Sequence, residues 1–336
     1  MISDRLKSSL KREFDQSLMA KLGLAIALVI ILVATFAPIL ATHHPGQTGH
    51  FDEEGSSYPP IGFDYETHAW EDGDDGRERI PHTVEPTSEH VLGTNNLGQD
   101  VYSRMLFGAR TSLLVGLIGT GLAAAFGVPF GLVAGYFGGR TDDSMMRVAD
   151  IMLAFPSLVL AIALIGVFGR SVQHIPDPIV MAGFADGMPE YAVLPGTVTL
   201  VVALVNWVWF ARVARGEALA IRNEEYVKAA RSLGASNWTV LRKHVLPNSL
   251  TPIIVLATIQ VAAIILLESS LSYLGFSGTT LSWGYEISQG QDYLRTAWWI
   301  STIPGIAIVL AVVSINLLGD WLRDALDPNI EGEGGV

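Results

Sequence analysis

The side chains best suited to chemistry are histidines, and most of them fall in one polar stretch rich in acids. Imidazole and carboxylate groups can bind a metal ion, but their spacing here matches no ligand pattern typical of zinc. The sequence therefore predicts no metal site. Six of the eight histidines belong to this stretch: His43, His44, His50, His68, His82 and His90.

No group of residues predicts catalysis. The chain has no GxxxxGK[ST] phosphate-binding loop, so we do not expect it to bind and hydrolyse ATP itself. It has no cysteine, which excludes disulfides and thiolate metal sites. We expect a protein that is not an enzyme and that holds no cofactor.

Six apolar runs are long enough to cross a bilayer whose apolar core is about 30 Å thick. They predict an all-α membrane protein with about six transmembrane helices. Of the 21 lysines and arginines, 15 lie in the two tails and in the stretches 137–147 and 211–248. Positive charge collects on the cytoplasmic side, so both termini of this multi-pass cell-membrane protein are expected there. The runs lie near 22–41, 112–136, 148–169, 193–210, 250–271 and 298–319.

Carboxylates within the apolar runs lie near their ends. An ion-coupled secondary carrier should have paired charges near the middle of the membrane, whereas Asp150, Glu268 and Asp320 lie at span ends. This position disfavours such a carrier. Two interpretations of Glu268 stay open: it faces a translocation path, as a possible gate, or it caps a helix end or bonds to a neighbouring helix.

The basic stretch 211–248 has the signals of two short helices joined by a corner. Asn223 is positioned to cap the first helix and Gly234 to end it, while Ser236 is positioned to cap the second. An apolar stripe of Tyr226, Ala229, Ala230 and Leu233 follows helical spacing. Its small central residues would let another protein approach the helix backbone closely.

The charge pattern also divides the chain. Residues 42–110 hold 13 acids and four basic residues, within a net charge of −12 for the chain. Such a stretch predicts a hydrated, partly disordered surface, as in proteins from salt-rich environments, rather than the core of an anchored enzyme. We expect a cytoplasmic tail and first helix (1–45), an acidic extracytoplasmic loop (46–110), a five-helix core (111–325) and a cytoplasmic tail (326–336).

Several motifs together resemble those of ABC importer permeases. The stretches KAARSLG (228–234) and HVLP (244–247) resemble the EAA motif, although Lys228 and His244 stand where glutamate and isoleucine are common. HVLGTNNLGQD (90–100) and DIMLAFP (150–156) are similar to sequences of the dipeptide/oligopeptide/nickel permeases, C-type subunit. Compared with that family, the loop 46–88 is longer and 171–193 looks like an insertion.

The resemblance implies the type I permease fold and a set of partners. These are a B-type permease, two ABC ATPases that hold ATP and Mg, and an extracytoplasmic solute-binding protein. It implies import of dipeptides or oligopeptides, with nickel chelates and oligosaccharides as alternatives. We expect the pore to be lined mainly by spans two to five, with few charges, so that it passes varied solutes without holding them tightly. The residues expected to couple the chain to the ATPases are Lys228, Ala229, Ala230, Leu233, Gly234, Leu246 and Pro247.

Overall fold

The chain folds mainly into long helices, with two small β-hairpins. A computed structural model describes residues 12–53, 55–73 and 76–326. The long helices are α2 (Leu18–Thr35), α4 (Val101–Phe137), α5 (Gly139–Leu153), α6 (Ser157–Phe168), α8 (Gly196–Ile221), α11 (Leu246–Tyr273) and α13 (Trp299–Leu326). The short helices are α3 (Ala37–Leu40), α7 (Pro178–Met181), α9 (Glu225–Ser232), α10 (Asn237–Val240), a π-helix (Leu241–Val245), α12 (Trp283–Gly290) and a 3-10 turn (Gln291–Tyr293). The strands are β1 (Tyr65–Gly73), β2 (Gly76–Val84), β3 (Val172–Pro176) and β4 (Tyr191–Pro195).

Five helical stretches of the described chain are long and apolar enough to cross a membrane: α2, α4, α8, α13 and Asn237–Tyr273, which ends in α11. The predicted third span is instead a pair of helices, α5 and α6, bent by 92°. Pro156 explains the break, because the residue before a proline avoids the helical conformation, and α6 begins just after it. Counted as one bent span, the pair completes the six predicted spans and confirms the all-α membrane class.

Two boundaries differ from those expected. Helix α4 begins at Val101 rather than near 111, because the Asp100 carboxylate caps it by accepting a hydrogen bond from the Ser103 amide at 2.8 Å. Helix α8 continues to Ile221, which shortens the predicted loop 211–248 to residues 222–245. The basic residues at 212 and 215 that indicated a loop are helical and pair with acids of α5.

Glycines let α4 and α8 pack backbone against backbone. A Cβ atom added at Gly127, Gly131 or Gly135 would lie 2.2, 2.0 or 2.4 Å from a carbonyl oxygen of α8. No larger side chain fits at these positions without a shift of the backbone. The repeated spacing therefore serves helix packing, as is common in membranes.

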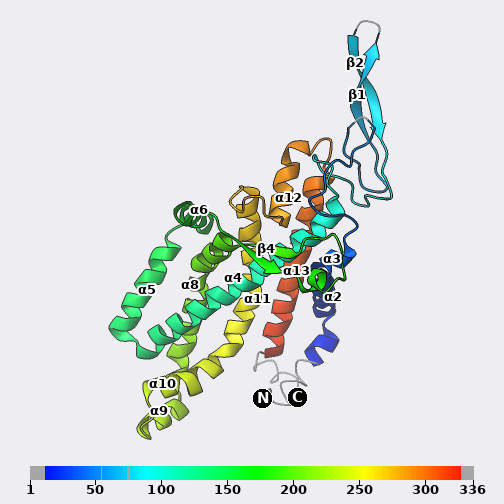
Figure 1. Ribbon diagram of the computed structural model, residues 1–336. Coiled ribbons are helices and arrows are strands. Elements are labelled where there is room, and N and C mark those ends of the chain that lie inside the picture. The colour runs from blue at the N-terminus through cyan, green and yellow to red at the C-terminus, as the bar shows by residue number, and fades with distance from the viewer. Residues whose placement is uncertain (1–11, 54, 74–75, 327–336) are drawn as a thin grey trace.

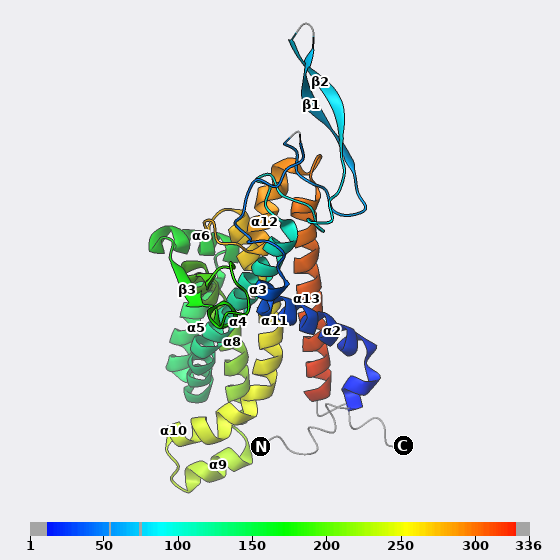
Figure 2. The ribbon, with the colours of Figure 1, turned by 45° about the vertical axis from the view of Figure 1, so that its right-hand side comes forward.

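The elements divide between the two ends of a helical bundle. Helices α9 and α10, the start of α2 and the end of α13 lie at one end, and the β1–β2 hairpin projects from the other (Figures 1 and 2). The hairpin runs from the pair Tyr65–Val84 to Gly73–Gly76, so part of the acidic stretch is ordered. Strands β3 and β4 pair antiparallel and bracket the predicted insertion 171–193.

Candidate functional site

The candidate site at the α9 end of the bundle is a helix, a glycine corner and a second helix. Helix α9 begins after Glu224, whose side chain makes no capping bond. The expected cap, Asn223, instead donates its side-chain amide to the Leu219 carbonyl at 3.2 Å. Gly234 ends the helix as predicted, with φ +85°, a conformation that glycine adopts without steric cost. Ser236 caps α10 by accepting a hydrogen bond from the Thr239 amide at 3.3 Å.

Helix α9 has one anchored face and one open face. Val227 is fully buried in the same apolar cluster as Val240 and Val245, and it holds α9 against the bundle. Ala229 and Gly234 are exposed, and the Leu233 side chain is 89% exposed. Small and apolar groups thus form an open surface on a helix whose opposite side is fixed.

The other residues predicted to couple the chain to ATPases lie around this surface. Lys228 Nζ lies 2.9 Å from Glu225 Oε1, in an exposed ion pair within one helical turn. Ala230 and Leu246 are half-buried, and Pro247 is exposed in the first turn of α11. The structure places all seven predicted coupling residues in the α9–α11 region, but only some of them on the open face.

The second helix of the site is continuous with a membrane-length helix. From α10 the chain passes through the π-helix Leu241–Val245 directly into α11, so that Asn237–Tyr273 forms one stretch of 37 residues. The tyrosine hydroxyl of Tyr136, near the end of α4, donates to Asn237 Oδ1 at 3.0 Å. The Arg231 guanidinium lies 4.6 Å from the centre of the Tyr136 ring. The site is therefore attached to both α4 and α11.

Glu268 lies near the far end of α11 and is enclosed by this chain. It is fully buried, and its carboxylate accepts hydrogen bonds from the hydroxyls of Ser112 in α4 and Ser272 in α11. Ser112 also accepts a hydrogen bond from the Trp283 amide at 3.3 Å. Glu268 thus joins α11, α4 and the start of α12, which is the helix-to-helix bond foreseen as one of its two roles.

A groove runs along the bent third span. It has a volume of about 440 Å³, and among the described residues none of those lining it is charged. Nε2 of Gln260 is buried and has no hydrogen-bond partner among the described residues. The polar residues in its lining are Ser157, Asn206 and Gln260, and the others are apolar or aromatic.

Two arginines close to the start of α4 make buried or half-buried ion pairs. Arg104 donates to both carboxylate oxygens of Glu286 in α12, with its closest nitrogen 2.6 Å away. Arg110 forms an ion pair with Asp177, the cap of α7. Burial alone would raise the pKa of Asp177, but the hydrogen bond and charge of Arg110 lower it overall. Because each arginine is paired with a carboxylate, both can lie next to the apolar part of α4.

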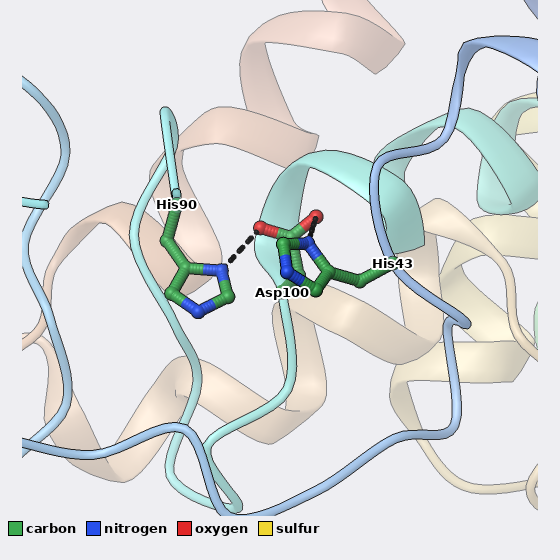
Figure 3. A group of neighbouring side chains, drawn as sticks. All are labelled: His43, His90 and Asp100. Carbon is green, nitrogen blue, oxygen red and sulfur yellow. Dashed lines mark hydrogen bonds and ion pairs between the residues drawn. The ribbon is translucent and has the colours of Figure 1, made fainter. Parts of the chain in front are cut away.

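The histidines of the acidic stretch are only partly gathered by the fold. His43 and His90 converge on Asp100 at the start of α4, as Figure 3 shows. His82 lies apart from this group and pairs with Asp52 at 2.7 Å. Spacing along the chain could not reveal the first group, because its members come from both ends of a long loop.

Comparison with known proteins identifies the family. Residues 127–332 match the model of the binding-protein-dependent transport system inner membrane component family. The chain belongs to this family. It is therefore a multi-pass membrane permease of an ABC importer, a class that works with ATPase and substrate-binding components.

Curated relatives are similar over almost the whole permease. The dipeptide transport system permease protein DppC of Alkalihalophilus pseudofirmus is 33% identical over 95% of this chain and 89% of its own length. The oligopeptide transport system permease protein OppC of Bacillus subtilis is 32% identical over 94% of this chain and 88% of its own length. The di/tripeptide transport system permease protein DppC of Pseudomonas aeruginosa is 34% identical over 92% of this chain and 88% of its own length.

A solved structure shares the fold of the permease. An inward-facing structure of the MetNI methionine ABC transporter aligns with a TM-score of 0.51 and 17% identity, over 67% of this chain and 97% of that one. The likeness supports the predicted ABC permease fold.

Two features of the permease could not be found from the motif residues. Val227, the anchor of α9, lies outside the predicted stripe, although it is the one β-branched residue in that helix. The Arg104–Glu286 pair joins residues 182 positions apart, and no local pattern connects them.

Proposed function

We propose that the permease forms one half of the translocation pathway of an ATP-driven peptide importer. Its other half is a B-type permease, two ATPases hold ATP and Mg, and an extracytoplasmic binding protein delivers the solute. The chain itself performs no catalysis. The observation that carries the proposal is the open α9 surface, anchored on its other side and continuous through α10 with a membrane-length helix.

In this proposal, α9 and the α10 corner receive the movement of the ATPases. Ala229 and Gly234 allow a partner to approach the helix backbone, and Leu233 offers an apolar contact. Because α10 leads into α11 without a break, a displacement of the site reaches the buried carboxylate of Glu268. The gate role of Glu268 then consists of releasing or forming its hydrogen bond to Ser112 of α4, which in turn accepts a hydrogen bond from the start of α12.

The uncharged groove along α5, α6, α8 and α11 is the proposed wall of the path. Peptides differ in the charge of their side chains but share amide groups. The amides of Asn206 and Gln260 can bond to such groups without selecting one charge, so selection is left to the binding protein. The names of the relatives, which include dipeptide and oligopeptide permeases, support this class of solute.

The experiment is uptake by host cells that lack this permease. Radiolabelled di- and tripeptides should enter wild-type cells, fail to enter the deletion strain and enter again when the chain is restored. Nickel chelates and oligosaccharides are tested in parallel. Restored uptake of only one of those solutes would assign the same machinery to that solute, and peptide import would be rejected.

A further inference from the structure

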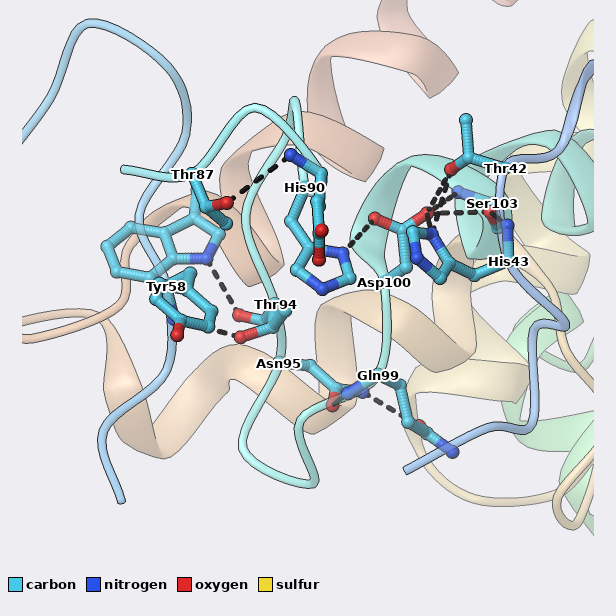
Figure 4. A network of polar contacts seen from close by, with 12 residues as sticks. Thr42, His43, Tyr58, Thr87, His90, Thr94, Asn95, Gln99, Asp100 and Ser103 are labelled. Carbon is cyan, nitrogen blue, oxygen red and sulfur yellow. Dashed lines mark hydrogen bonds and ion pairs between the residues drawn. The ribbon is translucent and has the colours of Figure 1, made fainter. Parts of the chain in front are cut away.

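The start of α4 is surrounded by three histidines and a buried aspartate. We propose that His43, His90 and Asp100 bind a zinc ion, with His50 as the fourth ligand. His90 and Asp100 are each 1% exposed, and the side chain of His43 is 21% exposed. His43 lies just after α3, His90 lies in the loop before α4, and Asp100 is the α4 cap, so three separate segments meet here (Figure 4).

The distances between the side chains suit a common ion. One nitrogen from each of His43 and His90 and one oxygen of Asp100 all lie within 4.8 Å of one another. His90 Nδ1 is 3.0 Å from Asp100 Oδ1, and His43 Nδ1 is 3.9 Å from Asp100 Oδ2. Ligands about 2 Å from a tetrahedral ion are separated by about 3.3 Å. The two distances end on different oxygens of Asp100, one a little below and one above that separation.

His50 supplies a second, independent observation. Its ring centre lies 5.2 Å from that of His43 and 4.8 Å from that of His90, while those two are 4.6 Å apart. These distances place the His50 ring beside the other two, but its nitrogens lie outside the group of ligand atoms that are within 4.8 Å of one another, so the ring would turn to bind as the fourth ligand. Nε2 of His50 is also buried without a hydrogen-bond partner among the described residues, a costly state unless something binds it.

The surrounding bonds hold the ligands in place. Asp100 Oδ2 accepts hydrogen bonds from the amide and hydroxyl of Ser103 at 2.8 and 2.6 Å. The Tyr58 ring stacks on the His90 ring with 6.0 Å between their centres. The backbone amide of Tyr58 donates a hydrogen bond to Thr94 Oγ1 at 2.9 Å. Figure 4 shows how this polar network encloses the aspartate and the two labelled imidazoles. Outer bonds of this kind fix the orientation of metal ligands.

The donor set selects the class of ion. Imidazole nitrogen with one carboxylate oxygen suits zinc, whereas calcium and magnesium require mostly oxygen ligands. The carboxylate of Asp100 also offsets the positive end of the α4 dipole, which would otherwise repel a cation. Bound zinc would connect the segment that follows α3 with the N-terminal end of α4.

The test uses the purified full-length chain in detergent, stripped with EDTA and dialysed. Zinc is then titrated, with bound metal counted by mass spectrometry and Co²⁺ used as a visible-absorption probe of tetrahedral geometry. We expect one ion per chain, undisturbed by excess Ca²⁺ or Mg²⁺. His43→Ala should weaken binding by about tenfold or more, since it removes a ligand. The adjacent, exposed His44 gives the control, because His44→Ala should retain wild-type affinity.

Thermal unfolding gives a readout that does not depend on transport. Zinc at one hundred times the wild-type Kd should raise the Tm of the wild type by about 5 °C. The same zinc concentration should raise the Tm of His43→Ala by about half as much or less, because a tenfold weaker site is then only at about ten times its Kd. If zinc does not bind, or binds His43→Ala and His44→Ala with equal affinity, the proposed zinc site is wrong. Unchanged affinity in His50→Ala would overturn the assignment of the fourth ligand. Failure of any of these leaves the peptide-uptake experiment unaffected, because neither measurement involves the solute.

Discussion

Glu268 is a single carboxylate whose bonds link three helices. If its charge contributes to the closed state of the outer gate, its loss should change the rate of transport and not the choice of solute. We therefore expect Glu268→Gln to alter the uptake rate, or to raise ATP hydrolysis without uptake, at unchanged peptide preference. The measurement is uptake of several labelled peptides together with ATPase activity in the assembled importer.

Ser112→Ala is the matched control for this change. It removes one hydrogen bond to Glu268 while keeping the charge, and its effect should be smaller and in the same direction. A shift in the relative uptake of different peptides by Glu268→Gln would mean that the carboxylate recognises the solute.

Arg104 and Glu286 form a buried pair in which each charge depends on the other. Removing one partner leaves an uncompensated buried charge, which costs about 3–5 kcal/mol. Glu286→Ala and Arg104→Ala should each lower the thermal stability of the detergent-solubilised chain. The double variant should lose less thermal stability than the two single variants lose when their losses are added together. Additive losses in size-exclusion melting curves would show that the pair contributes no coupling energy.

At the scale of elements, the open surface of α9 should tolerate small groups and reject large charged ones. Ala230→Arg and Gly234→Asp should stay in the membrane but lose ATP-driven uptake. Ala229→Arg is a cleaner change, because Ala229 is exposed whereas Ala230 is half-buried and Gly234 has a positive φ. An unpaired charge in a dry contact costs several kcal/mol, so uptake should fall at least about tenfold. Ala229→Ser, which stays small, should retain it.

The readout is recovery of the ATPases with the purified permease. Wild-type recovery and full uptake with Ala229→Arg would show that the ATPases do not contact this face.

The α4–α8 contact is a second element that can be tested with a matched pair. Gly131→Leu should prevent stable folding, because a Cβ there would already lie 2.0 Å from the Ala211 carbonyl oxygen. Gly121→Leu should be tolerated, since no described atom outside its own helix turn lies within 4 Å of a Cβ at Gly121. The amount of monodisperse protein in detergent measures both. Similar yields would mean that α4 and α8 can separate without loss of the fold.

For the whole molecule, the distribution of basic residues predicts that both termini and the α9 region face the cytoplasm. The chain has no cysteine, so single cysteines at Ser57 and Ser236 can be labelled with an impermeant maleimide on intact cells. Ser57→Cys should react and Ser236→Cys should not until the cells are opened. Labelling of Ser236→Cys but not of Ser57→Cys on intact cells would show that the α9 region faces the outside.

The sequence predicted the parts that depend on local chemistry. Hydropathy located the spans, Gly234 located the end of α9 and Ser236 the start of α10, because these signals follow from neighbouring residues. The predicted cap of α9, Asn223, was wrong, since its side chain bonds to the Leu219 carbonyl instead. The bend at Pro156 was missed, since its apolar surroundings hide a change of direction. The partners of Arg104 and Arg110, and the gathering of His43 with Asp100, depend on contacts between distant segments and required the fold.

In the proposed coupling, the continuous stretch Asn237–Tyr273 acts mechanically as a lever, with the π-helix Leu241–Val245 as its fulcrum. Glu268 lies 23 residues beyond Val245. That is about 35 Å along a helix, so a tilt of about 5° at the fulcrum displaces Glu268 by about 3 Å. Ser272 moves with α11, whereas Ser112 belongs to α4, so a displacement of that size would separate Glu268 from Ser112. The stiffness of the π-helix would set how much of the movement of α10 reaches Glu268.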